Sequence, residues 1–172
     1  MHFLRFIVSI IIILIIIFSA SLLLPSKITI SKGILINAPQ TAINKEIQDF
    51  GNWKNWYPAF QNENVSVVKK SSKEGIINSV SLKDNKEKRL DLDLIESKSD
   101  TTVIAVESAS STKVNYQFIL SANSNGQMLL IWNVNTFMGG YPWQRIKGIF
   151  LDKISGPQYE AALVNLKNAV EK

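Results

Sequence analysis

The spacing of apolar residues divides the chain into three kinds of sequence, and the first is an unbroken apolar run. Residues 6–24, FIVSIIIILIIIFSASLLL, contain no charge, and a helix needs about 20 apolar residues to cross a bilayer core. We therefore predict a transmembrane helix here, an anchor region 1–25 and a separate domain 26–172. A cleaved signal peptide is the alternative, with residues 19–21 as the small residues before the cut. The run continues to Leu24 and stops only at Pro25, which favours an uncleaved anchor.

The second kind of sequence alternates between apolar and polar residues, as half-buried strands do. It begins directly after Pro25 with KITISKGILI, where Ile28, Ile30, Ile34 and Ile36 recur at even positions. Turn-rich breaks separate six further candidates. These strands are expected at residues 65–70, 75–83, 87–97, 101–108, 113–122 and 127–137. The alternation predicts a sheet with one buried face and one wet face.

Helical periodicity is the third kind of spacing. Ala42, Ile43, Ile47 and Phe50 predict a short helix in APQTAINKEIQDF, followed by NWKNWYP as a helical turn or loop that ends at Pro58. The C-terminal stretch from residue 142 predicts a long amphipathic helix with a kink at Gly156-Pro157. Its expected apolar face consists of Ile146, Phe150, Ile154, Tyr159, Leu163, Leu166 and Val170.

The order of these elements predicts an α+β fold. A curved seven-stranded antiparallel sheet wraps on the long C-terminal helix, two short helices follow the first strand, and one transmembrane helix precedes them. Only Pro25 and Ser26 separate the apolar run from the first strand. Because an extended residue spans about 3.5 Å, the domain must lie against the bilayer.

Composition removes several classes of chemistry. The chain has no cysteine, and its single histidine, His2, precedes the apolar run, so we expect no metal site, no cofactor and no histidine-based nucleophile in the domain. The net charge of +5 comes mostly from scattered lysines, which does not favour nucleic acid. The basic residues that flank the apolar run nearly balance, and the short N-terminal tail favours an extracytoplasmic domain.

Two stretches carry a resemblance to a known family. GILINAPQTAINKEIQDFGNWKNWYP contains Ala38-Pro39 followed by Trp53, Trp56 and Pro58, and the closing helix ends in Leu163, Leu166 and Lys167. Over roughly residues 27–171, the chain resembles the SRPBCC superfamily of START-like and polyketide cyclase-like helix-grip proteins. That resemblance implies a deep apolar cavity for a lipid or another small hydrophobic molecule. As one fold hosts many activities, it does not fix the function.

The resemblance places Trp53 and Trp56 at a lid over one mouth of the cavity, with simple packing of both rings onto the sheet as the alternative. Further candidates for the cavity lining come from the late strands and the start of the last helix, again with core packing as the alternative. They are Tyr116, Phe118, Trp132, Met138, Tyr141 and Trp143.

Three functions stay open at this point. The first is a membrane-tethered, non-enzymatic module that binds a small hydrophobic molecule or lipid. The second is a cyclase- or hydrolase-like enzyme with Glu107, Tyr116 or Tyr141 as acid or base, against which the missing histidine counts. The third is a protein-interaction domain of the cell envelope, which an exposed apolar patch would favour.

Overall fold

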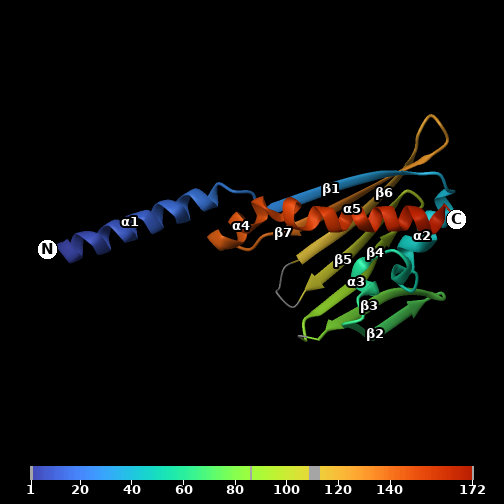
Figure 1. The fold of residues 1–172 in the computed structure, drawn as a ribbon, viewed down its shortest axis with the longest axis horizontal. Coiled ribbons are helices and arrows are strands. Elements are labelled where there is room, and N and C mark those ends of the chain that lie inside the picture. The colour runs from blue at the N-terminus through green and yellow to red at the C-terminus, as the bar shows by residue number, and fades with distance from the viewer. Residues whose placement is uncertain (1, 86, 109–112, 172) are drawn as a thin grey trace.

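The computed structural model describes residues 2–85, 87–108 and 113–171 (Figure 1). An N-terminal helix leads into a sheet with short helices after its first strand and two helices at the C-terminus. The elements are α1 (His2–Leu22), β1 (Lys27–Ile36), α2 (Gln40–Gln48), the 3₁₀ turn η1 (Trp53–Asn55), α3 (Pro58–Gln61), β2 (Val65–Lys73), β3 (Ile76–Asp84), β4 (Arg89–Ser97), β5 (Thr101–Ser108), β6 (Lys113–Ala122), β7 (Met128–Phe137), α4 (Pro142–Ile149) and α5 (Leu151–Val170).

The apolar run forms α1, which projects away from the rest of the molecule in Figure 1. Its segment Arg5–Leu22 is long and apolar enough to cross a membrane, and its side chains are almost entirely exposed. A helix that is hydrophobic all round and unburied needs an apolar surrounding.

The sheet has the predicted seven antiparallel strands, in the order β1-β7-β6-β5-β4-β3-β2. β1 therefore pairs with β7, with Ile30 opposite Val134 and Ile36 opposite Met128. Helix α5 crosses the inner face of the sheet, where it meets β1 (Figure 1). This arrangement confirms the predicted helix-grip architecture. The core lies between the inner face, α5 and α2, and it includes Val80, Leu92, Ile104, Phe118, Leu130, Trp132, Leu163 and Leu166.

The C-terminal region differs from the prediction at its break. The helix divides at Phe150, between α4 and α5, and Pro157 lies inside α5. The single long helix predicted from residue 142 is thus wrong, and α5 continues through Gly156-Pro157, where a kink is predicted. Pro157 removes a donor from the carbonyl of Lys153, but both residues are exposed, so water can reach that carbonyl.

The predicted apolar face of this region is also only partly right. Tyr159, Leu163 and Leu166 pack into the core as expected. In contrast, Ile146 is 39%, Phe150 is 54% and Ile154 is 73% exposed. Ile146 belongs to α4, Phe150 lies between the two helices and Ile154 belongs to the first turn of α5, at the end of the sheet next to α1 (Figure 1).

An ion-pair cluster joins β1 to α5. The ammonium of Lys32 lies 3.2 Å from Asp152 and 2.8 Å from Glu160. Buried Gly156 leaves room for it, because a Cβ there would lie 3.2 Å from Lys32 Nζ. The two carboxylates raise the pKa of Lys32, which is expected for a cation between acids.

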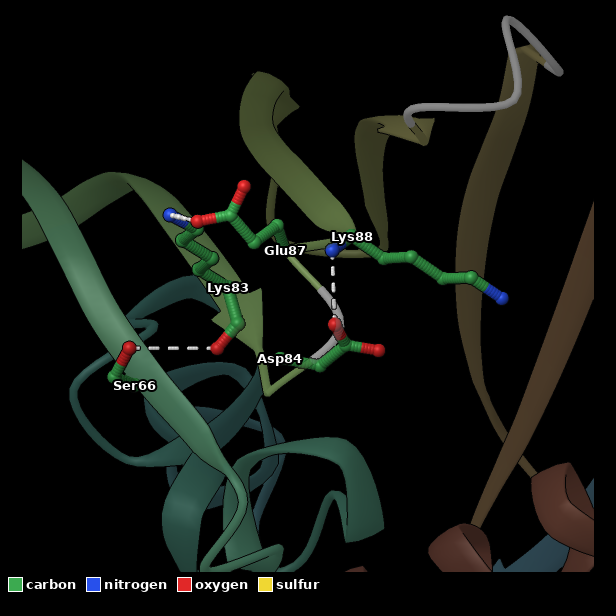
Figure 2. A network of polar contacts seen from close by, with 5 residues as sticks. All are labelled: Ser66, Lys83, Asp84, Glu87 and Lys88. Atoms are coloured by element: carbon green, nitrogen blue, oxygen red, sulfur yellow. Dashed lines mark hydrogen bonds and ion pairs between the residues drawn. The ribbon is translucent and has the colours of Figure 1, made fainter.

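The hairpin between β3 and β4 closes through a polar turn, which Figure 2 shows. Asp84 Oδ1 accepts a hydrogen bond of 2.8 Å from the Lys88 amide, and Lys83 pairs with Glu87 at 3.0 Å. Ser66 joins from β2 by donating to the Lys83 carbonyl. Beside this hairpin, edge strand β2 is irregular, because its register with β3 shifts after Val67 and after Ser71.

Candidate functional site

The aromatic residues of NWKNWYP are inside the protein. Trp53 and Trp56 are 0% exposed and Tyr57 is 3% exposed. The two indole rings pack against each other and against Phe118 of β6, with centroid separations between 4.8 and 6.5 Å. Aromatic pairs at such distances are stabilising. Side chains therefore fill this end of the space between the sheet and α5.

Both indoles also close the end of α2. Trp53 Nε1 donates to the Ile47 carbonyl at 2.8 Å, and Trp56 Nε1 donates to the Glu46 carbonyl at 3.2 Å. The last four carbonyls of a helix lack partners within that helix. The two tryptophans supply two of these partners and bury their rings at the same time, which explains why they lie so close together in sequence.

Trp132 of β7 is at the centre of the same cluster. Its ring stacks on Phe118 at 4.8 Å and meets Tyr116 and Tyr159 edge-on at 5.1 and 5.0 Å. Its Nε1 is buried and donates to no group of the described residues. A buried indole N–H without a partner reduces stability. Trp132 therefore differs from Trp53, whose N–H group donates to a backbone carbonyl.

Three tyrosines form a polar chain next to Trp132. The hydroxyls of Tyr57 and Tyr116 lie 3.0 Å apart, and the rings of Tyr116 and Tyr159 meet edge-on with centroids 6.2 Å apart. Burial raises the pKa of Tyr116 well above its usual value, and neighbouring Tyr57 and Tyr159 raise it further. The pKa of Tyr57 is likewise raised, mainly by burial. These phenols stay protonated at neutral pH and are poor bases.

The structure therefore places five of the eight predicted site residues in the core. Trp53, Trp56, Tyr116, Phe118 and Trp132 are each between 0% and 4% exposed. For Trp53 and Trp56, this burial agrees with the alternative that both rings pack onto the sheet. The reason is that both indole N–H groups find backbone carbonyls of α2, so neither ring needs contact with water.

The other three predicted residues gather at the opposite end of the sheet, around α4. A hollow of about 360 Å³ lies between the end of β7 and α4, and we call it the α4 hollow. Met138 and Trp143 line it, and Tyr141 stacks on Trp143 with ring centroids 4.8 Å apart. The remaining lining residues are Thr136, Gly139, Gln144, Lys147 and Leu151.

The α4 hollow lies directly beside the end of α1. The Met138 amide donates to the Ser26 carbonyl at 2.7 Å. Arg145 of α4 donates through Nη1 to the carbonyls of Leu22 at 3.0 Å and Leu24 at 3.2 Å. A cation at a helix C-terminus is favoured by the helix dipole, so this clamp joins α4 to the apolar helix.

Close packing holds α4 against the sheet. A Cβ on buried Gly148 would lie 3.0 Å from Ile28 of β1 and 3.3 Å from Met138, so this glycine lets the helix approach. Gln144 folds over Gly139, where a Cβ would lie 1.9 Å from Gln144 Oε1. That oxygen is buried and accepts no hydrogen bond from the described residues.

The candidate acids and bases do not come together. Glu107 is exposed on β5 and Tyr141 is 60% exposed, whereas Tyr116 is buried on β6. Glu107 pairs with Lys113, three residues along β6 from Tyr116, so the two side chains point to opposite faces of the sheet. Among the residues that the structure describes, no three His, Cys, Asp or Glu side chains could hold a metal ion.

No protein-family model matches the sequence, and no curated protein matches it. Solved structures do match. A START superfamily protein from Mycobacterium smegmatis aligns over 84% of this chain and 97% of its own, with a TM-score of 0.62 and 15% identity. The fold is START-like. A protein from Chromobacterium violaceum aligns over 84% of this chain and 99% of its own, with a TM-score of 0.60 and 13% identity. A protein from the dynemicin biosynthetic locus aligns over 86% of this chain and 48% of its own, with a TM-score of 0.54 and 10% identity.

Several residues of the α4 hollow in this START-like fold escaped sequence reasoning. Thr136 continues the inward alternation of Trp132 and Val134, and this signal could have identified it. Leu151 and Gln144 gave no comparable signal, because their contact with the hollow depends on the division of the helix at Phe150. The contact of Arg145 with α1 could not be read from the sequence, since it joins residues more than 100 positions apart.

Proposed function

We propose that this protein is a membrane-anchored binding module, without catalytic activity, that takes a small hydrophobic molecule or lipid in the α4 hollow. The proposal rests chiefly on the place of that hollow, beside the end of an apolar helix that can cross a membrane. In it, residues 1–25 are the anchor and residues 26–172 are the binding domain on the extracytoplasmic side.

The size and lining of the α4 hollow support this proposal. A volume of about 360 Å³ is within the range of small-molecule sites, roughly 300–1,000 Å³. Met138, Trp143 and Leu151 supply apolar surface, while Gln144 and Lys147 supply polar groups at one side. This combination suits an amphipathic guest with an apolar body and a polar or anionic end.

A cyclase- or hydrolase-like activity has less support. Its candidate groups Glu107, Tyr116 and Tyr141 lie on separate parts of the molecule, and general acid–base catalysis needs such groups within hydrogen-bond reach of one substrate. An envelope-protein partner remains the other alternative, because apolar side chains of α4 are exposed.

The full-length chain purified in mild detergent provides the test. We expect native mass spectrometry to detect a bound hydrophobic molecule, and we expect the variant Leu151→Trp to lose it because the larger ring fills the α4 hollow. The matched control is Leu90→Trp, which makes the same change in a separate hollow of about 190 Å³ beside β3 and β4. Absence of any bound molecule, or equal loss from both variants, would contradict the proposal.

A further inference from the structure

The outward side of α4 is more apolar than its inward side. Pro142, Gly148 and the amide of Gln144 face the sheet or the loop before α4. The outward positions instead carry large apolar groups that continue into the first turn of α5. We call this set the α4 surface, and it consists of Tyr141, Trp143, Ile146, Ile149, Phe150 and Ile154, each at least 39% exposed. A helix in water normally has the reverse arrangement, so this surface needs an apolar partner.

The Arg145 clamp limits what that partner can be. Arg145 bonds to the carbonyls of Leu22 and Leu24, at the point where the apolar segment of α1 ends. If α1 spans a bilayer, this point is where the chain leaves the hydrocarbon. The clamp then holds α4, and with it the α4 surface, close to the depth of the lipid headgroups.

The residue types also fit a lipid interface. Tyrosine and tryptophan concentrate at the boundary between headgroups and hydrocarbon, where their amphipathic rings are favoured. Tyr141 and Trp143 stack there with an interplanar angle of 9° and are 60% and 57% exposed. Basic residues flank them, since the charged residues between positions 137 and 154 are Arg145, Lys147, Asp152 and Lys153. Asp152 forms an ion pair with Lys32, and the three basic residues outnumber it. The net charge of this stretch is therefore positive, which favours contact with anionic headgroups.

We propose that the α4 surface inserts into the headgroup region of the bilayer that α1 crosses, and so fixes the orientation of the domain with the α4 hollow next to the lipid. The proposal depends on the membrane anchor of the proposed function. It adds a second membrane contact, made by the domain itself, that does not require the hollow to hold a ligand.

Site-directed spin labelling can test it, because the chain has no cysteine and each label site is unique. We would label the full-length variants Ile149→Cys and Ile154→Cys in vesicles of equal parts phosphatidylcholine and phosphatidylglycerol. The matched control is Ile95→Cys on β4, where the isoleucine is 65% exposed against 73% for Ile154. Exposed positions tolerate such changes with little loss of stability.

The measurement compares collisions of each label with oxygen, which enters hydrocarbon, and with a polar nickel chelate, which does not. We expect oxygen to dominate at positions 149 and 154 and the nickel chelate to dominate at position 95. If the protein floats with the vesicles but collisions with the nickel chelate dominate at all three sites, the α4 proposal is overturned and the anchor is left intact. Protein that does not float would overturn both. Broadening of the spin-label spectrum by a label on another molecule, at position 149 or at position 154, would show instead that the α4 surface contacts a second copy of the chain.

Discussion

Two short aromatic segments of this protein, NWKNWYP and GGYPW, have similar compositions and opposite environments. In the first, Trp53 and Trp56 are fully buried and their indole N–H groups bond to carbonyls of α2. In the second, Tyr141 and Trp143 are more than half exposed beside the end of α1. The difference lies in the neighbours. NWKNWYP follows the end of α2, whose last carbonyls need hydrogen-bond donors, and it faces the inner side of the sheet. GGYPW lies past the end of the sheet.

The comparison shows that aromatic residues near a proline can stabilise the fold or form an external surface. In this chain the two tasks are divided between the two ends of the sheet. The cluster around Trp132 holds the end of η1 and α5 on the sheet through Trp56 and Tyr159. The α4 surface adds nothing to the core and is available for contact with a partner.

The largest expected difference between the two regions is in stability. Replacing Trp53 or Trp132 with alanine should lower the free energy of unfolding by about 3–5 kcal/mol, because each leaves a large cavity among rigid rings. Trp143→Ala should change it by no more than about 0.5 kcal/mol, as the side chain is exposed. Guanidinium unfolding of the full-length chain in mild detergent, followed by near-ultraviolet circular dichroism, measures both. A cost for Trp143→Ala equal to that for Trp53→Ala would break the comparison.

A second expected difference is in the response to alkaline pH. Unfolded tyrosine ionises near pH 10, whereas burial raises the pKa of Tyr57, Tyr116 and Tyr159 above that value. Below about pH 10 both states hold these protons and the contribution is constant. As the pH rises further, only the unfolded state releases protons, so the free energy of unfolding falls by about 1.4 kcal/mol per pH unit for each such tyrosine.

Unfolding measurements between pH 9 and about pH 11 can follow this loss. Tyr116→Phe should make the decline less steep, because one raised pKa is removed. Tyr141→Phe is the control from the exposed segment, and its profile should follow that of the wild type. Identical slopes for wild type and Tyr116→Phe would show that the tyrosine chain does not carry the pH dependence.

The smallest expected difference lies within the buried cluster and depends on hydrogen bonds alone. Trp53→Phe removes a donor and leaves the Ile47 carbonyl without its indole partner. Trp132→Phe removes a buried N–H that donates to none of the described residues. The loss of ring volume is the same, so Trp53→Phe should cost about 1 kcal/mol more. Equal costs in the unfolding assay would mean that the indole bonds to α2 are not stabilising.

The architecture could be predicted from the sequence because the relevant signals are local. Alternation identified the seven strands, and β5 and β6 begin and end where the pattern predicts. The short helix and turn around NWKNWYP followed from spacing and from Pro58. In contrast, the division at Phe150 could not be predicted, because Gly156-Pro157 gave a stronger local signal for a break, and α5 nevertheless continues through exposed Pro157.

The candidate site was less predictable, because burial of an aromatic residue depends on distant partners. Nothing in NWKNWYP itself shows that Trp53 and Trp56 bond to the end of α2 rather than stand at an open mouth. Similarly, Ile146, Phe150 and Ile154 have the spacing of a core face, and only the position of α4 beyond the sheet leaves them exposed. Spacing thus predicts which residues share a face, while the tertiary arrangement decides what that face meets.

The irregular edge strand β2 has a consequence for how copies of this chain behave together. A straight edge strand offers unpaired backbone groups to a neighbouring molecule and is a common start of aggregation. β2 shifts its register after Val67 and Ser71, and it exposes Lys70 and Lys73. Bulges bend the strand and lysines repel an identical strand, and both features disfavour pairing of two such edges into a continuous sheet. At high local concentration of the protein, this irregular edge therefore protects each domain from its neighbours.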